Sequence, residues 1–154
     1  MKRSGWLTSL CILSLLFQGC GRAPGSGDRQ EIDSLKIRIE QLKPGLGEFM
    51  IQLKYHHDEL GKSIPSADYE RAAYEVDELA EITQKIRTLG IANDKLAKPA
   101  GLYFDQYLEG PLAGLARAAA GKDSAALAVN YAALTNNCNS CHQANKMEFM
   151  HIRQ

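Results

Sequence analysis

Residues 123–142 read DSAALAVNYAALTNNCNSCH, and this stretch decides the fold that the rest of the chain must match. Asp123 is a suitable N-cap, because its carboxylate can accept hydrogen bonds from the first free backbone N–H groups of a helix. Side chains of one face then follow at steps of 4, 3, 4 and 3 residues: Leu127, Tyr131, Leu134, Cys138 and Cys141. This spacing is helical. The stretch therefore predicts a C-terminal helix with both cysteines on its buried face.

Three further helices are expected before this one. Apolar residues recur at helical spacing over residues 44–61, 66–90 and 99–120, and glycine or proline marks the breaks. The third helix should be kinked or broken where Gly110 precedes Pro111. No stretch has the alternation of a convincing strand. We therefore expect an all-α fold, an antiparallel four-helix bundle over residues 44–154 with an additional N-terminal helical extension.

Composition sets limits on the function. The chain has 154 residues and is 45% hydrophobic and 23% charged, which is typical of one globular domain. Lys plus Arg and Asp plus Glu each number 18, so the formal net charge is zero. Because no basic excess is present to neutralise a phosphate backbone, nucleic acid is not expected as a partner.

The N-terminus has the pattern of an export signal. Lys2 and Arg3 precede an uncharged run of 12 residues, 6–17, which is too short to span a bilayer. Gly19-Cys20 then resembles the end of a bacterial lipoprotein signal, where cleavage precedes a cysteine that receives lipid.

This resemblance predicts a signal peptide over residues 1–19, lipidation at Cys20, and a lipid anchor with a flexible tether over residues 20–29. The location would be the periplasmic side of a bacterial membrane. Plain secretion with cleavage near Ala23, which would leave a soluble periplasmic protein, is the alternative.

A short heptad pattern follows the tether. Ile32, Leu35, Ile39 and Leu42 fall at a and d positions in the helix expected over residues 30–43. Fewer than two heptads are weak support for a coiled coil. The alternative is an extension of the first bundle helix, packed on its own domain or on a second copy, so a homodimer is one of the expected partnerships.

The five residues from Cys138 to His142 form the C-x-x-C-H sequence of c-type haem attachment. In that motif two thiols add to the porphyrin vinyl groups and the histidine binds iron. Positions i, i+3 and i+4 share a helical face, so all three groups can reach one flat macrocycle. The motif predicts one covalent haem on Cys138 and Cys141, with His142 as the proximal iron ligand.

Three alternatives compete with haem at these residues. They are a redox dithiol, a structural disulfide, and a zinc site that uses Cys138, Cys141 and His142 with His151. A thioredoxin-like dithiol lacks its βαβ context here, and a zinc ribbon lacks a second pair of ligands at suitable spacing.

A helical bundle with C-x-x-C-H on its last helix resembles the class II cytochromes c, the cytochrome c′ group. The segments PGLGEFM (44–50), HH (56–57), AAYEVDEL (72–79) and LTNNCNSCH (134–142) resemble a subgroup of small exported bundle cytochromes. The resemblance covers roughly residues 44–152. It implies thioether bonds at Cys138 and Cys141 and proximal ligation by His142.

The bundle topology also indicates a distal residue. If the first and last bundle helices are antiparallel, residue numbers at one level add to about 191. Met50 then lies level with Cys141, whereas His56 and His57 lie roughly 10 Å further along the axis. Met50 is thus the candidate distal group, either as a thioether ligand or as a pocket-filling residue beside five-coordinate iron.

Other polar residues have plainer interpretations. We expect His56 and His57 to be solvated or packed in the core, and the acidic stretch 75–81 to form a solvated helix face. Met147, Met150 and His151 follow the motif too closely to reach the opposite haem face, so they are interpreted as packing or tail residues.

The expected function is electron transfer with redox partner proteins, by a haem protein that is not an enzyme. No nucleophile and base, and no distal arginine and histidine, stand in a recognisable catalytic arrangement. A gas-binding sensor or scavenger for NO or CO, with five-coordinate iron, is the alternative.

Lipidation at Cys20 predicts membrane attachment that depends on this one thiol. Two or three acyl chains bind a membrane stably, where one does not. Cell fractionation should place the wild-type protein with membranes and Cys20→Ala in the soluble fraction. Recovery of the wild-type protein wholly in the soluble periplasm would leave only simple secretion.

Overall fold

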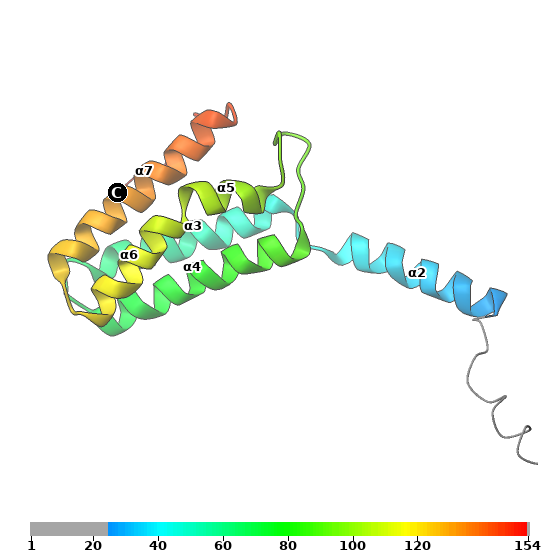
Figure 1. Cartoon of the computed structure of the whole chain (residues 1–154), viewed down its shortest axis with the longest axis horizontal. Helices are drawn as coiled ribbons and strands as arrows, with labels where there is room; N and C mark the ends of the chain where they lie inside the picture. Colours follow the sequence, from blue (N-terminus) through cyan, green and yellow to red (C-terminus); the bar gives the residue numbers. More distant parts are fainter. Residues whose placement is uncertain (1–24, 154) are drawn as a thin grey trace, which may run out of the picture. The chain divides into compact units, whose positions relative to one another are not determined.

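The computed structural model describes residues 25–153, and every regular element in that part of the chain is an α-helix. The expected all-α fold is therefore confirmed. The chain divides after Lys43 into two units (Figure 1). None of the described helices is both long enough and apolar enough to cross a membrane.

The first unit contains one helix, α2 (Ser26–Leu42). The carboxylate of Asp28 in its first turn accepts a hydrogen bond from the Gly25 N–H at 3.0 Å. The helix thus begins inside the expected tether, so the prediction of a flexible segment does not hold for residues 26–29. The predicted signal peptide and Cys20 lie outside the described residues.

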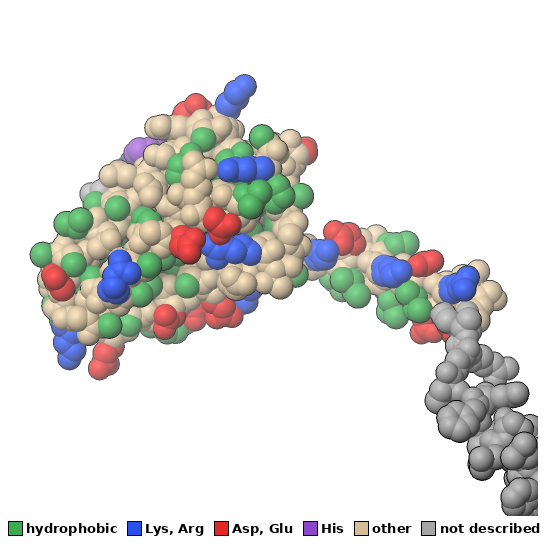
Figure 2. Space-filling view, in the orientation of Figure 1, with side chains coloured by type: hydrophobic (Ala, Val, Ile, Leu, Met, Phe, Trp, Pro, Cys, Tyr) green, Lys and Arg blue, Asp and Glu red, His purple; other side chains and the backbone are tan. Residues whose placement is uncertain are grey.

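No residue of α2 is buried. Its heptad positions are exposed, from 43% at Ile32 to 81% at Leu42. Figure 2 shows hydrophobic side chains on the surface of this helix among charged ones. The heptad stripe is thus present on one side of a regular helix whose own residues leave it exposed.

The second unit contains α3 (Leu46–Ser63), α4 (Tyr69–Leu89), α5 (Ala100–Tyr107), α6 (Glu109–Ala120) and α7 (Ser124–Ala144). Asp123 caps α7 as expected, accepting from the Ala126 N–H at 2.9 Å. Helix α4 also ends as expected, at Gly90 with a positive φ of 59°. It begins later than expected, because Asp68 is its N-cap and Ser66 instead bonds the Ser63 carbonyl.

The helix expected over residues 99–120 is two helices, α5 and α6, which meet at Leu108. Pro111 has no N–H, so the carbonyl four residues earlier, at Tyr107, loses its helical partner. The side chain of Asn137 on α7 donates to that carbonyl at 2.7 Å. The break in the helix thus becomes a contact point for α7.

Helices α3 and α4 pack together and run in opposite directions. His56 pairs with Glu75, whereas Glu59, one turn later on α3, pairs with Arg71, one turn earlier on α4. A short connection over residues 64–68 reverses the chain between them. Helix α4 also packs against α5 and α6 (Figure 1).

Helix α7 packs on α5 and α6, also in the opposite direction. Asn137 contacts Tyr107, and Asn130, nearly two turns earlier, lies so close to Gly114 that a Cβ there would meet its side chain at 2.0 Å. All five helices contribute to one core. Its largest fully buried apolar side chains are Leu60, Ile86, Leu115 and Leu127.

The bond from Asn137 to the Tyr107 carbonyl should contribute to stability. Asn137→Ala removes the donor and is expected to lower the free energy of unfolding by about 1–2 kcal/mol. Asn136→Ala is the matched control, because Asn136 is exposed and the same gain in helix propensity applies. Chemical denaturation measures both variants, and equal stabilities would contradict the role of Asn137.

Candidate functional site

The C-x-x-C-H motif lies in the last two turns of α7. Cys138 and Cys141 are free thiols, half-buried and packed against the core. Burial raises the pKa of Cys138 to about 12 and also raises the pKa of Cys141. Both thiols are therefore protonated at neutral pH, which is unlike a redox dithiol with an activated thiolate.

His142 has one ring nitrogen committed to the backbone. Its Nδ1–H donates to the carbonyl oxygen of Met150 at 2.5 Å. Because a carbonyl can only accept, this bond places the proton on Nδ1 and leaves the lone pair on Nε2. Nε2 has no hydrogen bond to the described residues, so it is the nitrogen that can bind a metal.

The C-terminal residues fold back along the end of α7. The Met147 N–H donates to the His142 carbonyl at 2.9 Å. The side-chain amide of Asn139 then makes two bonds to the backbone of Ile152, donating at 2.9 Å and accepting at 2.8 Å. The segment interpreted as tail from the sequence thus supplies the carbonyl that holds His142.

The zinc alternative receives no support from this geometry. Among residues 25–153, no three His, Cys, Asp or Glu side chains gather closely enough to hold a metal ion. His151, the proposed fourth zinc ligand, is exposed on the tail.

Helices α3 and α7 touch through side chains that define their register. His57 Nε2 bonds Thr135 Oγ1 at 2.8 Å, and a Cβ at Gly61 would lie 2.3 Å from the Tyr131 hydroxyl. In each pair the two residue numbers add to 192. The sum expected for residues at one level of an antiparallel pair is about 191, so the observed register differs by one residue. By helix rise alone, the same register would place Met50 level with His142.

Apolar residues near the motif are incompletely covered. No residue of α7 after Thr135 is fully buried. Met50 and Leu53 of α3 and both motif cysteines pack against the core and remain partly exposed. A flat, largely apolar haem fits these features. They are two free thiols, an imidazole with one uncommitted nitrogen, and apolar side chains that the protein covers only in part.

The two histidines of α3 are committed to packing. His57 is 3% exposed and stacks on Tyr131 with ring centroids 4.7 Å apart. Thr135 donates its hydroxyl to the Tyr131 carbonyl, so it accepts from Nε2–H of His57. Burial lowers the pKa of His57, which keeps this ring neutral. His56 pairs with Glu75 at 2.7 Å.

Glu75 corrects the sequence interpretation of stretch 75–81 as a solvated face. Its side chain is fully buried and bonds His56 and Arg71. The reason is its helical phase, because Glu75 follows Ala72 by three residues and adjoins Val76 on the inner face of α4. Asp77 and Glu81 do lie on the exposed side.

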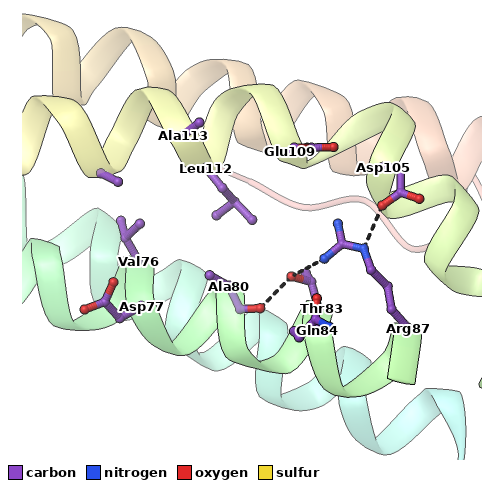
Figure 3. A pocket seen from close by; sticks show the side chains of 11 residues that line it. Val76, Asp77, Ala80, Thr83, Gln84, Arg87, Asp105, Glu109, Leu112 and Ala113 are labelled. Carbon is purple, nitrogen blue, oxygen red and sulfur yellow. Dashed lines mark hydrogen bonds and ion pairs between the residues drawn. The ribbon is translucent and has the colours of Figure 1, made fainter. Parts of the chain in front are cut away.

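A surface groove of about 620 Å³ lies between α4 and α6 (Figure 3). Val76 and Leu112 face it from the two helices, and the ion pair of Arg87 with Asp105, at 2.6 Å, lies at one end. No residue of the motif lines this groove. It is therefore separate from the candidate site on α7.

Comparison of the chain with protein-family models, curated proteins and solved structures finds no match.

Proposed function

We propose that this protein is an exported monohaem c-type cytochrome that transfers electrons. The observation that carries the proposal is the C-x-x-C-H motif on one helix, with His142 Nδ1 bonded to Met150 and Nε2 left for iron. Cys138 and Cys141 would hold the haem through thioether bonds, since both thiols are free and lie three residues apart on one helix.

The proposed architecture is an antiparallel four-helix bundle in which α5 and α6 together form the third helix. The opposite directions of α3 and α4, and of α7 against α5 and α6, support it. The side-chain contacts between α7 and α3 would close the ring of helices. This arrangement matches the expected resemblance to the cytochrome c′ group, with the motif on the last helix.

Met50 is the residue that favours electron transfer over gas binding. The register set by His57 and Thr135, continued along both helices, would bring Met50 to the level of His142, and Met50 packs against the same core as the motif cysteines. A bound haem supplies one-electron chemistry at its iron, whose potential depends on the axial ligands. A thioether from Met50 opposite His142 would complete both axial positions and leave no vacancy for a gas.

Export and anchoring complete the proposal. The signal over residues 1–19 and lipid on Cys20 would tether the bundle at the periplasmic face of a membrane, near protein redox partners. The exposed stripe of α2 is available for a second copy of the chain. No catalytic role is proposed.

The absorption spectrum of the reduced haem protein with and without CO tests this function. We expect a low-spin wild-type spectrum that CO leaves unchanged. Met50→Ala should open the distal position and bind CO, whereas Leu53→Ala, a half-buried neighbour on the same helix, should behave as the wild type. Rapid, stoichiometric CO binding by a high-spin wild-type protein would instead support gas binding.

A further inference from the structure

We propose that Asn139 is a positioning residue that holds the C-terminal tail against α7, so that the Met150 carbonyl fixes the His142 ring. This inference rests on the proposed haem function and assigns a role to a variable position of the C-x-x-C-H motif. The two residues act through the backbone of the tail, because Asn139 does not itself bond the histidine.

The contact between Asn139 and Ile152 uses both halves of the side-chain amide. Nδ2 donates to the Ile152 carbonyl at 2.9 Å, and Oδ1 accepts from the Ile152 N–H at 2.8 Å. This pairing fixes both the position and the orientation of the tail backbone, as one strand does for its neighbour. Asn139 and Ile152 are both half-buried, which limits competition from water.

Met150 lies two residues before this anchor, and its carbonyl accepts from His142 Nδ1–H at 2.5 Å. A backbone turn precedes the anchor, because the Met150 N–H donates to the Met147 carbonyl at 2.9 Å, but side-chain packing adds little. Phe149 is 79% exposed and Met150 48% exposed, so their side chains bury little apolar surface. Among residues 25–153, the Asn139 amide is the side chain that bonds the tail backbone beyond Met150.

Holding the carbonyl in place has a chemical consequence for His142. An acceptor on Nδ1–H fixes the ring rotation and the tautomer, and it makes Nε2 a stronger donor to a metal. A loose tail would let water replace Met150, so the histidine would donate less strongly. A weaker axial donor stabilises the oxidised iron less, and the reduction potential should rise.

The test compares full-length Asn139→Ala with Ser140→Ala. Ser140 is the matched control, because it occupies the other variable position of the motif and its hydroxyl bonds only the Asn136 carbonyl within α7. A chain ended after Met147 removes the Met150 carbonyl directly and serves as the second variant. Intact mass first establishes haem attachment, and then the reduction potential and the exchange rate of the His142 Nδ1–H, by proton NMR, are measured.

We expect Asn139→Ala and the shortened chain to show a more positive potential and faster Nδ1–H exchange, and Ser140→Ala to match the wild type. A haem-bearing Asn139→Ala with wild-type potential and exchange would overturn the role of Asn139 and leave the haem proposal standing. The role of Asn139 is also overturned if the potential and the exchange rate change in the shortened chain alone. If Asn139→Ala does not fold, an unaltered potential in the shortened chain overturns the inference. A wild-type protein without haem would overturn both proposals.

Discussion

The helical spacing of Cys138, Cys141 and His142 is the constraint on which the rest of the structure depends. Under the proposed function these three groups would have to reach one flat haem and would need a rigid support, and α7 is a regular helix from Ser124 to the end of the motif. Helix α7 is itself held in place by packing on α5 and α6. The carbonyl of Tyr107, freed by Pro111, binds Asn137 one residue before the first motif cysteine. A defect in one helix thereby fixes the position of another.

Buried polar groups set the register of the remaining helices. Glu75 needs His56 and Arg71, and His57 needs Thr135, because a buried polar group without a partner costs more than its bond contributes. Sliding α3 by one residue would break these pairs together. We infer that the main effect of these buried pairs is to select one register of the helices over the others.

Much of the helical pattern can be predicted from local chemistry in the sequence. The Asp123 cap and the Gly90 stop depend only on neighbouring residues, and the α3 to α7 register follows from an antiparallel pairing. The burial of Glu75 could not be predicted, because it depends on partners supplied by α3. The proposed roles of Asn139 and Met150 could not be predicted for a similar reason. A backbone carbonyl is present at every residue, so the sequence does not indicate which one accepts from His142. Both roles depend on the tail folding back along α7, and the sequence pattern does not predict this.

The central claim is that Cys138 and Cys141 carry one covalent haem. Its most direct test is the intact mass of the mature protein from a host with haem-attachment machinery, after extraction of non-covalent haem. We expect the chain mass plus one haem for the wild type, and the bare chain mass when both cysteines are changed to Ala. An unmodified wild-type mass, or haem retained without the two cysteines, would contradict it.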